Sequence, residues 1–167
     1  ETFNMASLWK LPVVFIIENN QYAMGTSIDR ASSTPKLFTR GQAFNIPGKL
    51  VDGMDVLKVS KATEAAATNC RNGNGPYILE MNTYRYKGHS MSDPAKYRTR
   101  EEVQNIKDKK DPIENFQKSL LKQGVKEDEF KKIDQKIKRT ISEAAEFAIH
   151  SEEPELSDLF KDIYLEH

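Results

Sequence analysis

Cysteine, long apolar runs and net charge are all scarce in this 167-residue chain. Cys70 is the single cysteine, so no internal disulfide can form, which fits a reducing compartment. The longest apolar run, residues 11–17, is far shorter than the roughly 18 residues of a membrane span, so we expect no membrane partner. Because 25 Lys and Arg residues balance 25 Asp and Glu residues, bulk charge argues against nucleic-acid binding. No Cys or His spacing suggests zinc, and no glycine-rich phosphate loop is present.

The neutral total hides a division of charge along the chain. Residues 1–100 carry 13 Lys and Arg against 8 Asp and Glu, a net +5, and the remainder carries 12 against 17, a net −5. The first part alternates short apolar runs with helical patterns, whereas the second has apolar residues at helical spacing in a charged background. We therefore predict two parts, residues 1–98 and a helical tail over 99–167.

The pattern of the first part predicts an α/β fold with a parallel sheet flanked by helices. The expected elements are a helix over 1–10, a strand over 13–17, a weak helix over 35–44, a short strand within 50–56, an Ala-rich helix from Ser60 or Lys61, and a strand over 77–83. The apolar run 13–17 is expected to be a central strand covered on both faces.

The tail is expected to be three helices, over residues 99–107, 111–121 and 128–150, with Asp111 capping the second. An apolar stripe through Ile133, Ile137 and Ile141 continues through three alanines, 144, 145 and 148. The opposite face is charged, so this helix is expected to dock on a surface.

Two loops that follow expected strands carry polar chemistry, and ligands of parallel sheets bind at such places. Residues 18–26 are dense in oxygen donors, and the amide of Asn20 could hold Mg²⁺ beside phosphate without adding negative charge. The alternative is that Asn19 and Asn20 simply build a turn. Residues 84–94 contain His89, which could donate a proton or a hydrogen bond to an anionic substrate, or be an ordinary surface histidine.

The residues of these loops resemble a known family. The matching stretches are 4–12 (NMASLWKLP), 18–26 (ENNQYAMGT), 51–55 (VDGMD), 83–86 (TYRY) and 88–94 (GHSMSDP), followed by Tyr97-Arg98. Together they resemble the alpha subunits of the thiamin diphosphate-dependent 2-oxo acid dehydrogenases. Residues 24–26 (MGT) and 51–55 (VDGMD) favour the pyruvate dehydrogenase member over the branched-chain one. The resemblance covers nearly the whole chain and implies the C-terminal part of the thiamin diphosphate-binding fold, followed by a helical tail.

The resemblance implies a cofactor site built on thiamin diphosphate and Mg²⁺. It assigns the Asn20 side chain and the Tyr22 backbone carbonyl as metal ligands, and places Ala23 and His89 against the cofactor. The family's opening Gly-Asp-Gly motif would precede Glu1, so the resemblance implies a C-terminal fragment that is inactive alone.

The resemblance also implies a catalytic role and partners. His89 would act as a proton donor when the acetyl group passes to a lipoyl group. A beta subunit would complete a heterotetramer of two alpha and two beta chains, and a lipoyl-bearing acetyltransferase would accept the product. Cationic Arg85, Lys87 and Arg98 would suit the diphosphate or an acidic lipoyl domain, or would be solvated bases.

Ser90 matches a position that is phosphorylated in mitochondrial relatives, where a phosphate would oppose order in the loop. The following residues 93–97 are shorter than in those relatives and lack a second serine, and Lys87 replaces a common histidine. These departures favour a bacterial, cytoplasmic chain over one of the mitochondrial matrix. Two alternatives stay open: a branched-chain 2-oxo acid or acetoin dehydrogenase alpha subunit, and a non-catalytic interaction module that uses the apolar stripe.

Overall fold

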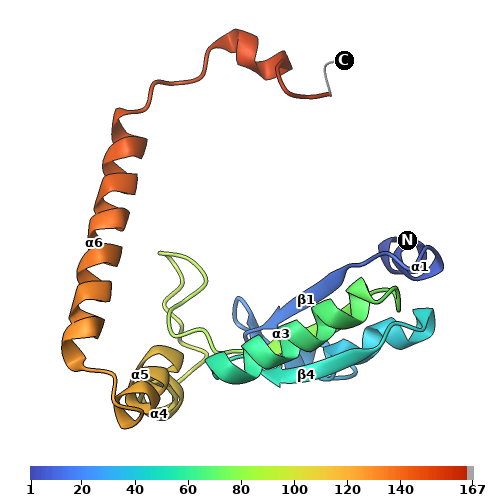
Figure 1. Cartoon of the computed structure of the whole chain (residues 1–167), viewed down its shortest axis with the longest axis horizontal. Coiled ribbons are helices and arrows are strands. Elements are labelled where there is room, and N and C mark those ends of the chain that lie inside the picture. Colours follow the sequence, from blue (N-terminus) through green and yellow to red (C-terminus); the bar gives the residue numbers. More distant parts are fainter. Residues whose placement is uncertain (165–167) are drawn as a thin grey trace. The chain divides into compact units, whose positions relative to one another are not determined.

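The structure is a computed structural model that describes residues 1–164, and it contains two compact units, Glu1–Ser119 and the part from Leu120 onward (Figure 1). The elements in chain order are α1 (Thr2–Leu8), β1 (Val14–Asn19), β2 (Tyr22–Ala23), β3 (Thr26–Ser27), α2 (Ile28–Ala31), the 3₁₀ helix η1 (Leu37–Phe44), β4 (Gly48–Asp52), α3 (Val56–Arg71), β5 (Tyr77–Asn82), α4 (Arg100–Lys110), α5 (Pro112–Lys122), α6 (Glu127–His150) and the 3₁₀ helix η2 (Leu156–Phe160).

A parallel three-stranded sheet with the order β1-β5-β4 confirms the predicted α/β class, and the β4-α3-β5 crossover joins two parallel neighbours. The expectation that residues 13–17 form the central strand is wrong. In the described sheet β1 pairs with β5 alone and Ile16 is 59% exposed. The central strand is β5, whose residues 78–81 are all buried. An apolar run predicts that a strand is buried, but it does not give the strand's position in the sheet order.

Each face of the sheet is covered by a different helix. On one face Leu79 and Met81 of β5 pack with Ala62 and Ala66 of α3. On the other face η1 lies so close that a Cβ added at Gly41 would come within 2.4 Å of Ile78 Cδ1. Phe3 of α1 also packs on this face, since its ring centroid lies 4.8 Å from that of Phe15 and 6.0 Å from that of Phe44.

Helix α3 begins at Val56, earlier than the predicted Ser60 or Lys61. The reason is a cap at Asp55, whose carboxylate accepts hydrogen bonds from the backbone N–H groups of Leu57 and Lys58 at 3.1 and 3.0 Å. Between β1 and η1, where the sequence predicted a polar loop, the chain instead forms the β2-β3 hairpin and the single turn of α2.

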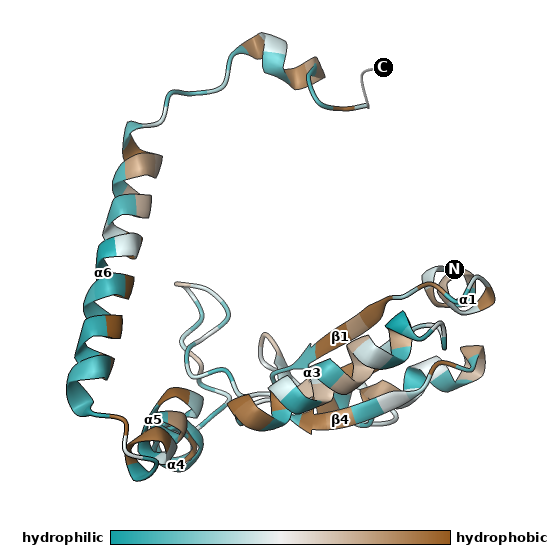
Figure 2. Cartoon of the chain, viewed as in Figure 1, coloured by the Kyte–Doolittle hydropathy of each residue, from teal (hydrophilic) through white to brown (hydrophobic). Residues whose placement is uncertain are grey.

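The three tail helices were predicted to within a few residues, and Asp111 caps α5 by accepting from the N–H groups of Ile113 and Glu114. The stripe on α6 is exposed: Ile133, Ile137 and Ile141 are 56, 55 and 65% accessible, and the apolar positions recur along the helix in Figure 2. What covers this stripe stays a prediction. Within residues 1–164 no helix combines the length and apolarity needed to cross a membrane.

Candidate functional site

The carboxyl ends of the three strands meet at one edge of the sheet. The register pairs Asn82 at the end of β5 with Asn19 at the end of β1 and with Asp52 at the end of β4. The loops that follow all three strands therefore start from the same edge, which is where ligands of parallel sheets bind.

The loop after β1 turns sharply through consecutive asparagines. Asn19, 8% exposed, accepts a hydrogen bond at Oδ1 from the Gln21 N–H at 3.1 Å. Asn20 Oδ1 accepts from the Tyr22 N–H at 3.2 Å, and Gln21 takes a left-handed φ of +74°. The predicted turn is therefore confirmed. It leaves the half-buried Asn20 with a second acceptor lone pair, so turn formation does not use up the oxygen expected to bind a cation.

This turn lines a pocket of about 290 Å³. Asn20, Tyr22 and Ala23 border it, together with Glu18 and with Arg40 of η1. Within residues 1–164 no cluster of three or more His, Cys, Asp or Glu side chains could hold a metal ion. A cation bound at this turn would therefore rely on amide and carbonyl oxygens and on oxygens brought by its own ligand.

The loop after β5 folds around the carboxylate of Asp93. Its Oδ2 accepts from the His89 N–H at 2.7 Å and from the Tyr97 hydroxyl at 2.8 Å, and its Oδ1 accepts from the Ala95 N–H at 2.9 Å. These bonds, chiefly the one from His89, lower the pKa of Asp93, while the bond to Asp93 raises the pKa of Tyr97. A segment without helix or strand is in this way given a defined shape.

The side chain of His89 is exposed, and its Nδ1 lies 2.8 Å from Arg85 Nη1. A guanidinium group has only donors, so Nδ1 is the acceptor in this contact and the neutral ring carries its proton on Nε2. Ser90 is also exposed, with its Oγ 3.0 Å from Ser92 Oγ. His89 is therefore oriented by the loop and still open to solvent.

Arg98 joins the two loops. It is 7% exposed and donates to the backbone carbonyls of Arg85 and Lys87, the latter at 3.0 Å. Its guanidinium carbon lies 5.1 to 5.4 Å from the ring centroids of Tyr84, Tyr97 and Tyr22, and the Tyr22 and Tyr97 rings are 5.1 Å apart. The interpretation of Arg98 as a solvated base is therefore wrong, because it is buried as the link between the loops.

Two tyrosines fix the start of the second loop to the helices that follow it. The Tyr84 hydroxyl donates to Glu102 of α4 at 2.6 Å, and the Tyr86 hydroxyl donates to Asp111 at 3.1 Å. Burial, followed by the carboxylate partner, raises the pKa of each tyrosine to about 12. Both hydroxyls therefore stay protonated as donors at neutral pH.

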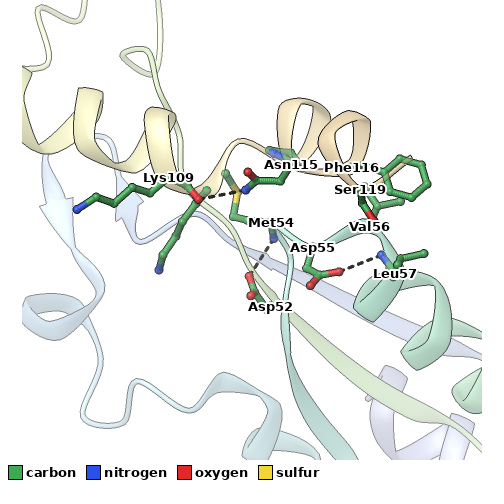
Figure 3. Close-up of a pocket in the computed structure, with 11 residues that line it drawn as sticks. Asp52, Met54, Asp55, Val56, Leu57, Lys109, Asn115, Phe116 and Ser119 are labelled. Atoms are coloured by element: carbon green, nitrogen blue, oxygen red, sulfur yellow. Dashed lines mark hydrogen bonds between the residues drawn. The ribbon is translucent and has the colours of Figure 1, made fainter. Parts of the chain in front are cut away.

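A further pocket, of about 280 Å³, lies at the carboxyl end of β4 (Figure 3). Asp52 there accepts from the Met54 N–H at 3.2 Å, and Asn115 donates to the Lys109 carbonyl at 3.1 Å. Both Asp52 and Asp55 are paired with Lys58. Sequence reasoning missed this pocket because its lining comes from segments more than 50 residues apart, 52–57 and 109–119.

The structure thus brings together the two loops that the sequence singled out, with Asn20, Tyr22 and Ala23 on one and His89 and Ser90 on the other. Sequence reasoning missed Glu80, which is fully buried beneath the first loop, and the organising role of Asp93. A glutamate inside an otherwise apolar strand was the available signal for Glu80.

The chain belongs to the dehydrogenase E1 component family, whose model matches residues 1–157. It is 53% identical over 166 residues to the pyruvate dehydrogenase E1 component subunit alpha of Rhizobium meliloti, covering 99% of this chain and 48% of that protein. The subunit of the same name from Zymomonas mobilis is 53% identical over 163 residues, covering 98% and 46%. The testis-specific mitochondrial form of Homo sapiens is 51% identical, covering 98% and 42%. The chain therefore spans about half the length of the curated relatives it matches.

Proposed function

We propose that this chain is part of a pyruvate dehydrogenase (acetyl-transferring) alpha subunit, which decarboxylates pyruvate oxidatively and passes the acetyl group to lipoamide within the pyruvate dehydrogenase complex. The observation that carries the proposal is identity of about half the residues, over nearly the whole chain, to relatives of that name. Residues 1–98 would be the cofactor-binding part. Residues 99–167 would be a helical tail packed on the same domain or on a partner subunit.

The cofactors proposed are thiamin diphosphate and Mg²⁺. The Asn20 side-chain oxygen and the Tyr22 backbone carbonyl would bind the metal, and Ala23 and His89 would contact the cofactor. The donor set fits, because neutral amide and carbonyl oxygens suit a hard cation that also binds diphosphate. When bound, thiamin diphosphate supplies the electron sink for loss of CO₂ from a 2-oxo acid.

His89 would act as a proton donor during acetyl transfer to the lipoyl group. Its exposed ring supports a place beside the substrate, and the contact between Arg85 and Nδ1 leaves the Nε2–H to face a substrate as a hydrogen-bond donor. The pairing of Asp93 with the His89 N–H would keep the histidine at the mouth of the site.

The partners proposed are a beta subunit, in a heterotetramer of two alpha and two beta chains, and a lipoyl-bearing acetyltransferase. The exposed stripe through Ile133, Ile137 and Ile141 supports a protein partner for the tail, since a row of apolar side chains is costly to leave in water.

The test replaces His89 by Ala in the alpha subunit that carries this chain, assembled with its beta subunit. Loss of lipoamide acetylation is expected, with His150→Ala as the matched control, since His150 is an exposed histidine on α6. Overall activity retained by His89→Ala would remove the proposed role. Turnover compared on pyruvate, acetoin and branched 2-oxo acids separates the candidate substrates. Calorimetry that found neither Mg²⁺ nor thiamin diphosphate binding, with beta pairing intact, would favour the interaction module.

Ser90 is exposed, so a kinase could reach it, but the shortened sequence after it favours a bacterial, cytoplasmic chain without that regulation. The relatives matched come from both bacteria and mitochondria, and the two bacterial subunits named above are each 53% identical. Mass spectrometry of the native protein should find Ser90 unmodified, and phosphate on Ser90 would contradict this assignment.

A further inference from the structure

Glu80 is a fully buried carboxylate on the central strand β5, with 0% of its surface exposed. Its neighbours Leu79 and Met81 point to the apolar α3 side, and Glu80 points to the η1 side. There Oε1 accepts from Asn19 Nδ2 at 2.7 Å and Oε2 accepts from the Phe38 N–H at 2.9 Å. A carboxylate is costly to bury, so its two partners are both needed to keep it there.

The carboxylate determines which way the amide of Asn19 points. A carboxylate only accepts hydrogen bonds, so the amide must turn its Nδ2 toward Glu80. Oδ1 then points the other way, where it accepts from the Gln21 N–H at 3.1 Å. The orientation of one buried amide therefore connects the middle of the sheet to the turn after β1.

That turn is strained and needs such support. Gln21 has φ +74°, a left-handed conformation that carries a steric cost for any residue with a Cβ. The Gln21 side chain is held as well, since Nε2 donates to Asn82 Oδ1 at 2.5 Å and to the Asn19 carbonyl at 3.3 Å. Such a conformation persists where surrounding bonds determine it, and Glu80 orients one of them.

We propose that Glu80 is a positioning residue that acts through Asn19 to hold the turn 19–22 in the shape that presents the Asn20 and Tyr22 oxygens to a divalent cation. This inference rests on the proposed function, in which those two oxygens bind Mg²⁺. Glu80 itself does not touch the metal, because both of its oxygens are engaged by N–H donors below the turn.

The test is Glu80→Gln in the assembled subunits, with Mg²⁺ titrated in the presence of thiamin diphosphate and followed by calorimetry. A glutamine has one oxygen where the carboxylate has two, so its NH₂ faces either Asn19 Nδ2 or the Phe38 N–H. If the Asn19 amide flips to accept from it, the bond to the Gln21 N–H is lost. The half-saturating Mg²⁺ concentration is expected to rise about three- to tenfold, the equivalent of one ordinary hydrogen bond.

Ser7→Ala is the matched control for loosening of η1, since the Ser7 hydroxyl donates to the Phe44 carbonyl at 2.6 Å at the other end of that helix. It should leave the Mg²⁺ titration unchanged. Asn19→Ala should weaken Mg²⁺ binding to a similar degree as Glu80→Gln, and it keeps the inference testable if Glu80→Gln fails to fold. In the Asn19→Ala background, Glu80→Gln should cause little further change, because its path to the turn is gone.

The outcomes separate this inference from the function on which it rests. Wild-type subunits that bind no Mg²⁺ with thiamin diphosphate would refute the proposed function. Wild-type binding together with unchanged Mg²⁺ affinity in both the folded Glu80→Gln and the folded Asn19→Ala subunits would refute the role of Glu80 alone. Equal weakening by Ser7→Ala, or additive effects in the double variant, would also refute it, because each would mean that Glu80 acts only through general packing.

Discussion

Replacing Arg98 by Met should open the loop over residues 84–98 without unfolding the domain. Methionine keeps much of the apolar stem of Arg98 but removes the guanidinium that donates to the carbonyls of Arg85 and Lys87. In the closed loop these two carbonyls would then have no hydrogen-bond donor, because the side chain of residue 98 is buried there. In the open loop water would donate to them.

The size of the effect follows from the contacts that are lost. Hydrogen bonds from a charged donor contribute about 1.5–3 kcal/mol each, so two are worth roughly 3–6 kcal/mol. Arg98 Nε is buried without a hydrogen-bond partner in the described structure, and relief of that burial returns about 1–3 kcal/mol. The net loss is then about 3 kcal/mol, which corresponds to roughly a hundredfold rise in the open population of the loop.

Limited trypsin digestion under native conditions measures this population when opening and closing are fast. Cleavage after Lys87 and Lys96 should rise about a hundredfold in Arg98→Met, while cleavage after Lys61 in α3 serves as the internal reference. Arg100→Met, at the exposed first residue of α4, is the matched control and should leave cleavage after Lys87 and Lys96 unchanged. Unaltered cleavage at both loop lysines in Arg98→Met would refute the view that Arg98 holds the loop.

Two further predictions concern the same unit. The hydrogen bonds of Asp93 lower its pKa, so its contribution to loop order is complete above the ordinary aspartate pKa of about 4 and is lost as pH falls through the lowered value. The protection of the His89 amide, measured as its exchange rate relative to the intrinsic rate at the same pH, should therefore fall only there, and a loss of protection already at about pH 6 would contradict this. Gly41→Ala should lower the free energy of unfolding by about 1–3 kcal/mol, because the new methyl group meets Ile78 Cδ1. Ile78→Val should relieve part of that loss, as measured by denaturant unfolding. If the losses of the two single variants simply add in the double variant, the clash is refuted.

The sequence was sufficient for the features that depend on local pattern. Periodicity and capping depend on residues that are close in sequence. This is why the sequence predicted the apolar run of β1, the Ala-rich helix α3 and the cap at Asp111. The strand order was not, since the position of β5 between β1 and β4 depends on pairing across more than 25 residues. The start of α3 was misplaced because Asp55 was not considered as a cap.

The candidate site divides in the same way. Asn20, Tyr22 and His89 were identified through a resemblance carried by contiguous stretches, and their loops do meet in the structure. Their supports were not identified, because the contacts between Asn19 and Glu80 and between Arg98 and Tyr22 join residues that are 61 and 76 positions apart. For Arg98 the sequence shows only the positive charge. The role of this residue depends on its burial, which the sequence does not show.

The acidic groups around the site constrain how it could bind a metal. Glu80 is satisfied by two N–H donors, Asp93 by three donors, and Asp52 by the Met54 N–H and Lys58. Glu18 is the acidic residue among those that line the pocket beside Asn20, so the described turn offers neutral oxygens and at most one negative charge. A small, strongly hydrated dication gives up its water reluctantly to such a set. Under the proposed function, a cation at this turn would have to arrive with its own anionic ligand, and a diphosphate would meet that requirement where a bare ion would not.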